Sequence, residues 1–242
     1  MIALFTDFGL AGPYVGQLHA VLAQQAPGTP VIDLFHDVPN HDIRAAAYLL
    51  PAYARGLQPG TVFVGVVDPG VGTDRPAVML HADHRWYVGP GNGLFEIVAR
   101  RAQVCEWREI LWRPGRLSAS FHGRDLFAPV AAMLVRGVAP ESRSWTPAPP
   151  GGAWPDDLAE VVYIDRFGNL LTGIRAPNVP RTARVQVAGH VLPHARTFGE
   201  VAAGEGFWYE NANGLVEIAV NGGRADHRFG CTVGAAVDVI FV

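Results

Sequence analysis

The sequence of 242 residues contains no lysine, since arginine supplies all 19 of its basic side chains. This absence excludes Schiff-base chemistry, lysine-anchored pyridoxal phosphate and a P-loop, each of which needs a lysine amino group. Cysteine is also scarce. Cys105 and Cys231 are too few for a disulfide framework and lack the spacing of metal ligands, so a reducing cytosol is compatible and both thiols are expected in the core.

Long apolar runs are missing as well. No segment reaches the ~18 apolar residues that span a bilayer, and the N-terminal MIALFTDFG has no basic leader, so we expect a soluble, cytoplasmic protein. The formal charge is −3 and the arginines are scattered, which gives no attraction to phosphate backbones. The expected partner is therefore a small molecule, with neither nucleic acid nor membrane involved.

The first half of the chain alternates strand-like and helix-like patterns. Strands are predicted at 2–6, 31–35, 61–68, 77–82, 85–89 and 104–111. Helices are predicted at 15–22, 43–50, 94–101 and 125–136. The second helix has an N-cap candidate in Asn40 or Asp42 and meets Pro51. This alternation predicts an α/β domain over residues 1–137, with a mostly parallel, Rossmann-like sheet.

The composition changes after residue 137. Residues 138–157 carry five prolines and two adjacent glycines, a composition typical of an extended linker. Residues 158–242 consist of β-type runs broken by glycine and asparagine, with a hairpin signal at Asn213-Gly214. They predict a small antiparallel domain, a β-barrel or a sandwich.

Two predicted strands end in carboxylates, at the edge where open α/β sheets bind ligands. Asp7 is a candidate for binding ribose hydroxyls, although it could instead cap the loop or the next helix. Asp68 begins a Pro-Gly turn that is followed by Arg75, which an ordinary Asp-Pro-Gly turn would also explain. His122 precedes a helix that Asp125 could cap, and it is a candidate acid, base or hydrogen-bond donor.

Two segments of the C-terminal part, 165–169 and 217–225, contain residues that a turn alone does not need. They combine an exposed aromatic residue, an amide and free backbone edges, which suit the stacking and edge recognition of a purine. Side chains of the metal-ligand type also occur, at His36, Asp37, His41, Asp42, His81, Asp83 and His84. These residues lack the pairing and spacing of familiar zinc or iron sites, so no metal is expected.

Seven blocks occur in order along essentially the whole chain: Thr6-Asp7-Phe8-Gly9, Pro13-Tyr14-Val15-Gly16, Val66-Val67-Asp68-Pro69-Gly70-Val71-Gly72-Thr73 with Arg75, Gly89-Pro90-Gly91-Asn92-Gly93, Phe121-His122-Gly123-Arg124-Asp125, Asp165-Arg166-Phe167-Gly168-Asn169 and Glu217-Ile218-Ala219-Val220-Asn221. Together they resemble the S-adenosyl-L-methionine hydroxide adenosyltransferases, which are adenosine-forming S-adenosylmethionine (SAM) hydrolases related to fluorinase and chlorinase. The resemblance implies an N-terminal α/β domain and a C-terminal β-barrel domain.

The same resemblance implies an activity and a set of site residues. Water or hydroxide attacks C5′ of the ribose and expels methionine, without a metal or organic cofactor. Asp68, Arg75 and His122 match the family's catalytic triad. The implied substrate-binding residues are Asp7 at the ribose diol, Asp165, Phe167 and Asn169 around methionine and adenine, Ala212 and Asn213 at the amino-acid end, and Glu217, Val220, Asn221 and Gly222, with Asn221 and the backbone beside it at the adenine edge.

The implied mechanism is physically reasonable, because the sulfonium makes methionine a neutral leaving group and the protein needs mainly to position a water. Asp68 would accept a hydrogen bond from this water and Arg75 would stabilise its hydroxide character. His122 would either orient the water or relay its proton. Two positions depart from the family pattern: Gly91 stands where the family usually has Asp, and Asn213 at a position that is often aromatic.

Two other functions remain open at this stage. One is a halogenase that uses chloride or fluoride on the same substrate, although only 13 residues separate Arg75 from Gly89, without the extra loop of that group. The other is a non-catalytic adenosine or SAM sensor. The resemblance further implies a homotrimer with sites at subunit interfaces.

Overall fold

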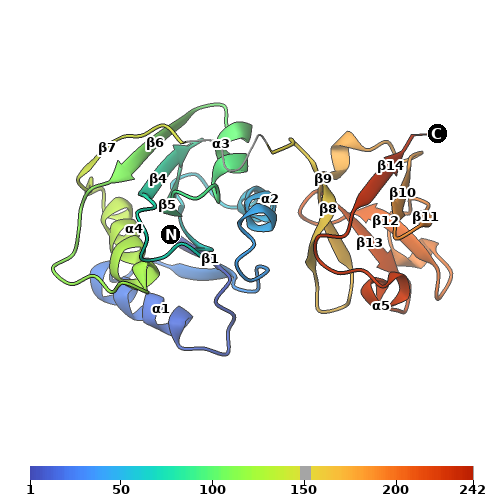
Figure 1. The fold of residues 1–242 in the computed structure, drawn as a ribbon, viewed down its shortest axis with the longest axis horizontal. Helices are drawn as coiled ribbons and strands as arrows, with labels where there is room; N and C mark the ends of the chain where they lie inside the picture. The colour runs from blue at the N-terminus through green and yellow to red at the C-terminus, as the bar shows by residue number, and fades with distance from the viewer. Residues whose placement is uncertain (148–153, 242) are drawn as a thin grey trace. The chain divides into compact units, whose positions relative to one another are not determined.

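The computed structural model describes residues 1–147 and 154–241, and the chain divides into two compact units, Met1–Ala153 and Trp154–Val242 (Figure 1). Residues 148–153, within the stretch predicted as a linker, lie outside the described residues. Residues 142–144 of that stretch form an edge strand instead, because their backbone pairs antiparallel with residues 108–110. The expected linker is therefore shorter at its N-terminal side.

The N-terminal unit is built on one seven-stranded sheet with the strand order β2-β1-β3-β5-β4-β6-β7. Its strands are β1 (Ile2–Thr6), β2 (Val31–Phe35), β3 (Val62–Val66), β4 (Ala77–Ala82), β5 (Arg85–Pro90), β6 (Cys105–Ile110) and β7 (Ser142–Ser144). The first four in this order run parallel, and β4 reverses the direction between β5 and β6. The predicted mostly parallel sheet is confirmed.

Helices cover both faces of this sheet (Figure 1). They are α1 (Tyr14–Gln25), α2 (Ile43–Ala54), α3 (Glu96–Arg101), the π-helix η1 (Gly123–Phe127) and α4 (Ala128–Val135). Helices α1 and α4 lie side by side and pack on one face, where Leu18 and Val130 join a fully buried core with Leu4 and Val64. Helices α2 and α3 lie together on the other face.

Two local predictions for these helices need correction. The helix that was expected to end where it meets Pro51 runs through it to Ala54. A proline inside a helix costs about 3 kcal/mol, and burial of most of α2 against the sheet outweighs that cost. Asp42 is the N-cap, with its carboxylate accepting from the Ala45 N–H, whereas Asp125 caps no helix and lies inside η1. Cys105, expected in the core, is exposed.

The order of the strands creates a switch point between β1 and β3. From these adjacent parallel strands the sheet extends to β2 on one side and to β5 on the other. The loops after β1 and β3 therefore leave in opposite directions, and a crevice opens between them at the carboxyl ends of the strands. This is where Asp7 and Asp68 lie.

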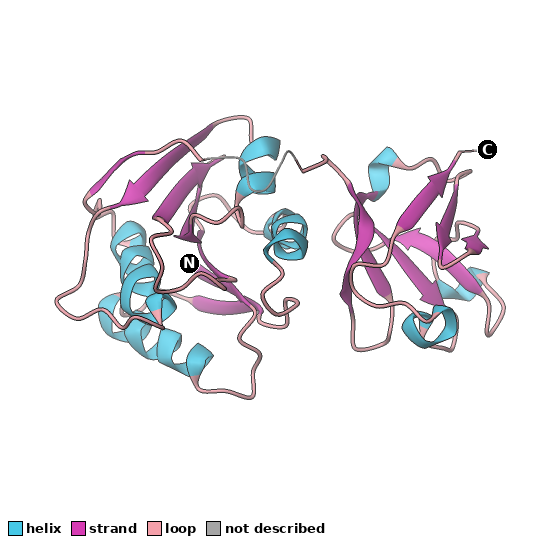
Figure 2. Cartoon of the chain, in the orientation of Figure 1, coloured by secondary structure: helices cyan, strands magenta, loops and turns pink. Residues whose placement is uncertain are grey.

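The C-terminal unit consists mainly of antiparallel strands, drawn in magenta in Figure 2. They are β8 (Leu158–Ile164), β9 (Leu170–Arg175), β10 (Arg184–Val187), β11 (His190–Leu192), β12 (Gly206–Glu210), β13 (Leu215–Val220) and β14 (Val237–Ile240). The described part of this unit also contains the short α-helix α5 (Ala225–Phe229) and the 3-10 helices η2 (Ala176–Asn178) and η3 (Phe198–Glu200).

Two sheets share the core of this unit, with the orders β12-β13-β9-β8 and β11-β10-β14. Single bridges, Glu160 to Ala236 and His194 to Trp208, join their outer edges, so the strands close into a small barrel. Across the described residues of both units, no helix has the length and apolar character needed to cross a membrane.

Candidate active site

A cavity opens in the N-terminal unit where the loops after β1 and β3 diverge. Residues of four segments line it: the loop after β1 with the start of α1, the loop after β2, the end of β3 with the turn that follows, and residues 120–123. The lining residues are Asp7, Phe8, Tyr14, Asn40, His41, Val66, Asp68, Val71, Ser120, Phe121, His122 and Gly123. Three candidates from the sequence, Asp7, Asp68 and His122, therefore share one cavity.

Asp68 and Arg75 form a two-pronged ion pair at this cavity. The turn that begins at Asp68 closes with the Val71 N–H donating to the Asp68 carbonyl over 3.3 Å, and it brings Arg75 back toward the strand end. Arg75 donates from Nε to Asp68 Oδ1 over 2.9 Å and from Nη2 to Asp68 Oδ2. The two side chains, Arg75 and Asp68, are 10% and 5% exposed. A planar guanidinium suits a carboxylate in this geometry, and the ordinary-turn interpretation does not explain the buried pair.

His122 completes the group. Its Nδ1 lies 2.9 Å from Arg75 Nη2, so one guanidinium contacts both Asp68 and His122. Because arginine can only donate, Nδ1 accepts this bond and the ring hydrogen is on Nε2. Burial, followed by the nearby Arg75 cation, lowers the pKa of His122, which favours the neutral ring at pH 7. The Arg75 guanidinium also lies 5.3 Å from the centre of the Phe127 ring.

The backbone around the triad is held by neighbouring loops. Asn92 donates from Nδ2 to the carbonyl of Val67, the residue before Asp68, over 2.9 Å. Gly72 has a φ of 82°, and a Cβ there would come within 2.7 Å of the Ala119 carbonyl, so its turn approaches the segment that carries His122 closely. At Gly91 a Cβ would lie 2.8 Å from Pro76 and Val78 side-chain atoms. The aspartate usual in the family would therefore force a shift here.

Asp7 is held by a loop distant in sequence. Its side chain is 9% exposed, and its Oδ2 accepts from the backbone N–H of His41 over 3.0 Å. His41 donates from a left-handed backbone conformation, with a φ of 63°, which is strained for a residue other than glycine. Asp7 thus fastens a loop, as its alternative interpretation expected, and also lines the cavity.

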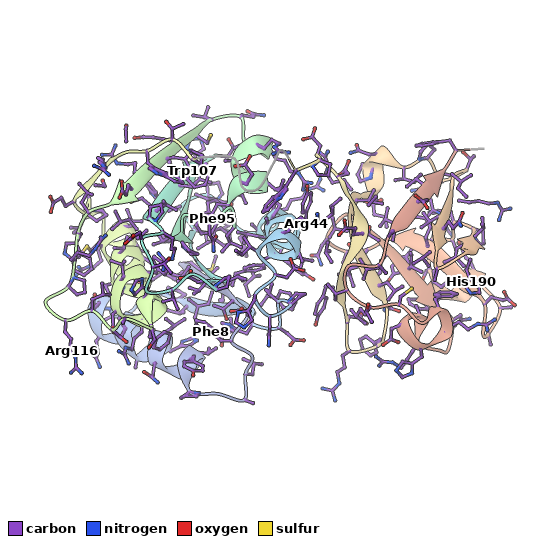
Figure 3. The ribbon with its side chains drawn as sticks, in the orientation of Figure 1. Phe8, Arg44, Phe95, Trp107, Arg116 and His190 are labelled. Carbon is purple, nitrogen blue, oxygen red and sulfur yellow. The ribbon has the colours of Figure 1, made fainter. Side chains whose placement is uncertain are left out.

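Three aromatic rings form one wall of the cavity. Phe8, labelled in Figure 3 at the loop after β1, lies with its ring centre 5.6 Å from that of Tyr14 and 5.8 Å from that of Phe121. Arg124 covers the outer face of Phe121 and donates to both oxygens of Asp125, which in turn accepts from the Ser118 N–H. The role of Asp125 is thus to hold the segment before His122.

A second pocket lies in the C-terminal unit. It is lined by Asp165, Phe167, Asn169, Phe198, Tyr209, Glu217, Val220, Gly222, Gly223 and Arg224. Asp165 closes the turn between β8 and β9, since its Oδ1 accepts from the backbone N–H groups of Phe167 and Asn169 and its Oδ2 accepts from the Asn169 side chain. The turn presents Phe167 with 74% of its surface exposed. Six residues of the sequence-based substrate set line this pocket.

Glu217 lies buried in the second pocket, with 5% of its surface exposed. Its carboxylate accepts from the Tyr209 hydroxyl and, over 2.9 Å, from the Asn211 side chain. Burial raises the pKa of Glu217, and the nearby Asp165 carboxylate adds to the rise. Burial also raises the pKa of the Tyr209 hydroxyl, and Glu217 adds to that shift.

Sequence reasoning missed Phe198 and Tyr209, which line the second pocket, and Asn211, which donates to Glu217. Gly223 and Arg224 also line it and lie in the segment 217–225, but neither was named as a site residue. The Asn213-Gly214 signal indicates a hairpin but not its register: a two-residue loop there would place Glu210 opposite Glu217, whereas the observed three-residue loop 212–214 pairs Tyr209 with Glu217.

Three residues of the expected substrate set, Ala212, Asn213 and Asn221, line neither pocket. Asn221 donates its side-chain N–H to the Val201 carbonyl over 2.6 Å. Asn213 donates its backbone N–H to Asn211 Oδ1 within the hairpin turn that also contains Ala212. In the described part of the chain, no group of three or more His, Cys, Asp or Glu residues is placed to hold a metal ion.

Comparisons with known proteins agree over the whole chain. Residues 2–144 match the N-terminal domain of the SAM hydroxide adenosyltransferases and residues 159–238 match their C-terminal domain. Proteins named (R)-S-adenosyl-L-methionine hydrolase are similar: the one from Thermus thermophilus is 42% identical and covers 99% of each chain, and the one from Salinispora tropica is 41% identical and covers 96% of this chain and 95% of its own.

Solved structures give the same picture. The crystal structure of an uncharacterized conserved protein from Thermotoga maritima has a TM-score of 0.87 and 33% identity, covering 99% of this chain and 100% of that chain. A conserved hypothetical protein from Thermus thermophilus has a TM-score of 0.76 and 38% identity, covering 99% of both chains. From the two domain matches and the identity to full-length relatives, the chain belongs to the SAM hydroxide adenosyltransferase family.

Proposed function

We propose that this protein is a SAM hydrolase, which splits its substrate into adenosine and L-methionine with Asp68, Arg75 and His122 as catalytic residues. The activity is the one named for relatives 41–42% identical over nearly the whole chain. The observation that carries the residue assignment is the Arg75 guanidinium, which contacts both Asp68 and His122 beside one cavity.

The leaving group of this reaction needs little assistance from the protein. A water oxygen forms a bond to ribose C5′ while the C5′–S bond breaks, and the electron pair moves to sulfur, which becomes the neutral thioether of methionine. One proton is released as the water becomes the 5′-hydroxyl of adenosine. The protein therefore needs to hold the water in line with the breaking bond and to favour its loss of a proton.

The triad is suited to these two tasks. Each Asp68 oxygen already accepts from Arg75 and keeps a further lone pair, so the carboxylate can accept a hydrogen bond from the water. Arg75 fixes that carboxylate through two hydrogen bonds and supplies positive charge near the developing hydroxide. Because His122 carries its hydrogen on Nε2, it can donate to the water oxygen, and this tautomer favours orienting the water over relaying its proton.

Substrate binding is proposed for two sets of residues. Asp7, whose carboxylate lines the cavity with Asp68, would accept from the ribose hydroxyls. In the C-terminal unit, Asp165, Phe167 and Asn169 would contact methionine and adenine, and Glu217, Val220 and Gly222 line the same pocket. Ala212, Asn213 and Asn221 remain in the proposed set on family resemblance alone.

Three finer points belong to the same proposal. The relatives' names specify the (R) epimer, so we propose that the sulfonium of R configuration is the substrate. We propose, on the family resemblance, a homotrimer in which the two sets of binding residues, which lie on separate compact units, come together between copies. Mixing Asp68→Ala with Asn169→Ala chains under subunit exchange should then restore part of the activity. We also propose a cytoplasmic location.

The deciding experiment incubates the pure protein with each SAM epimer in ¹⁸O-labelled water, with and without chloride, and identifies the nucleoside by mass spectrometry. We expect adenosine labelled at its 5′ oxygen, from the (R) epimer, regardless of chloride. A 5′-chloro nucleoside would indicate a halogenase, and binding without turnover would indicate a sensor. Asp68→Asn protein is the control for background hydrolysis.

A further inference from the structure

A chain of hydrogen bonds runs from the surface of α1 to the residue that precedes Asp7. His19 on α1 lies with Nε2 2.7 Å from Asp33 Oδ1, and His36 lies with Nε2 3.0 Å from the same oxygen. His36 Nδ1 then lies 2.7 Å from the Thr6 hydroxyl. The His36 side chain is 2% exposed and Thr6 is fully buried, whereas Asp33 is 44% exposed. None of these residues has a role in the mechanism proposed above.

The direction of the bonds follows from their partners. The Thr6 oxygen accepts from the Phe8 N–H over 3.2 Å, and its own buried hydrogen needs an acceptor, which His36 Nδ1 provides. His36 must then carry its ring hydrogen on Nε2, which donates to the Asp33 carboxylate. Although partial burial opposes it, hydrogen bonds from His19 and His36 lower the pKa of Asp33, which suits an anionic anchor.

These hydrogen bonds act on the backbone of Asp7. The bond between the Thr6 oxygen and the Phe8 N–H spans Asp7, so it restricts the torsion angles that aim the Asp7 carboxylate. His36 also connects the loop after β2 to the loop after β1, since its backbone carbonyl accepts from the Gly9 N–H over 2.7 Å. The loop that begins at His36 leads to His41, whose N–H holds the Asp7 carboxylate.

We propose that His36 is a positioning residue, which sets the direction of the Asp7 carboxylate by holding the Thr6 hydroxyl and the loop after β2. The inference rests on the proposed role of Asp7 in binding the ribose. If these hydrogen bonds set the direction of the Asp7 carboxylate, its selectivity for a ribose diol depends on a buried histidine that never touches the substrate.

Two amide substitutions divide the functions of the imidazole. In His36→Asn the shorter side chain places its amide near the position of Nδ1, so it can still accept from Thr6. In His36→Gln the longer side chain places its amide near Nε2, so it can still donate to Asp33 but leaves Thr6 without its acceptor. Thr6→Ser and Thr6→Val form a second pair, which keeps or removes the hydroxyl and leaves His36 intact.

The measurement is the ratio of binding constants for adenosine and 2′-deoxyadenosine, alongside the melting temperature and kcat and KM for SAM. Because the ribose diol would lose a charged acceptor, Asp7→Ala should reduce the preference for adenosine by about 10-fold to 100-fold. We expect His36→Gln and Thr6→Val to lose at least about threefold of this preference, with KM raised more than kcat is lowered. His36→Asn and Thr6→Ser should keep it, although both His36 variants lose thermal stability.

The outcomes separate the two levels of the argument. If Asp7→Ala keeps the preference for adenosine, the ribose role of Asp7 and the inference on His36 both fail. If Asp7→Ala loses it while Thr6→Val and His36→Gln keep it, the His36 inference alone is overturned. The inference would also be overturned if His36→Asn and His36→Gln lost the preference for adenosine equally, in proportion to their losses of melting temperature. Such a result would show that the role of His36 is merely structural. If His36→Gln does not fold, the Thr6 pair decides.

Discussion

In the N-terminal unit the carboxylate of Asp68 pairs with a guanidinium, whereas in the C-terminal unit the buried carboxylate of Glu217 accepts from the neutral Tyr209 and Asn211. The two environments differ in charge. Asp68 lies against a cation, while burial raises the pKa of Glu217 and favours its protonated form. A carboxylate that is braced by a guanidinium can orient and polarise a water, whereas a buried one that accepts from neutral groups is better suited to shaping a pocket.

On the proposed function, the N-terminal unit therefore carries the reaction and the ribose contact of Asp7, and the C-terminal unit carries the recognition of methionine and adenine. Asp165 and Asp7 also differ in how their side chains are held. Asp165 is fixed by the backbone of its own turn, whereas Asp7 is held by a loop 34 positions away in sequence. The C-terminal pocket is held by contacts within one turn, whereas the N-terminal cavity depends on several separate segments.

The strongest test of this division replaces one aspartate in each unit. Asp68→Asn should lower kcat by about 100-fold or more, because the water loses a charged acceptor. Asp165→Asn should raise KM and leave kcat within about threefold, because it alters only a recognition residue. Steady-state kinetics on both variants, with melting curves to verify folding, make the comparison. A similar loss of kcat in both would contradict the division.

The second test concerns the shape of the cation. Arg75→Lys keeps the charge but cannot contact both Asp68 and His122 as a planar guanidinium does. We expect kcat to fall by at least about 10-fold with KM little changed, since each charge-assisted bond lost is worth about 1.5–3 kcal/mol. The exposed Arg116→Lys substitution in the same unit is the control. Full activity of the Arg75→Lys protein would mean that the site needs only a positive charge.

Sequence predicted local relationships best. The strands that carry Asp7 and Asp68 follow from their apolar patterns, and the Gly-rich turn indicated that Asp68 and Arg75 lie near one another in the chain, although an ordinary turn would explain the same residues. Contact of His122 with Arg75 spans 47 positions and was expected only through the family resemblance. The bonds from Tyr209 and Asn211 to Glu217 depend on hairpin register. The hydrogen bonds that link His19 to Thr6 depend on how α1 packs on the sheet. Such relationships arise from packing, which local pattern does not specify.

The third test uses the pH dependence of stability. The pKa of Glu217 is raised in the folded protein, so between the unfolded value and the folded value the native state holds a proton that the unfolded state releases. Its contribution to stability is therefore present at low pH and is lost as pH rises through this window. In Glu217→Gln this loss should disappear, because the amide does not titrate in this range. The amide can still accept from Asn211 and donate to the Tyr209 hydroxyl, so the pocket keeps its hydrogen bonds.

Thermal unfolding from pH 4 to pH 8 measures the effect of Glu217. Glu210→Gln, at an exposed position on the neighbouring strand, is the matched control and should leave the pH profile unchanged. If the profile of Glu217→Gln is parallel to that of the unchanged protein, the buried carboxylate titrates normally, and the contrast with the paired carboxylate of Asp68 fails.

The smallest expected effect concerns how Asp7 is held. The imidazole of His41 is 76% exposed and its Nδ1 lies 3.9 Å from Asp7 Oδ2, a pair that solvent screens to about 0–1 kcal/mol. The backbone N–H of the same residue is the closer partner, at 3.0 Å, and it survives any substitution except proline. In His41→Gly and His41→Ala, KM for SAM should therefore rise by less than about fivefold. The glycine variant should be the more stable of the two, because the φ of 63° strains alanine and not glycine. A rise of tenfold or more in both variants would show that the imidazole itself holds Asp7, and the catalytic cavity would then depend on a surface charge as well as on its backbone.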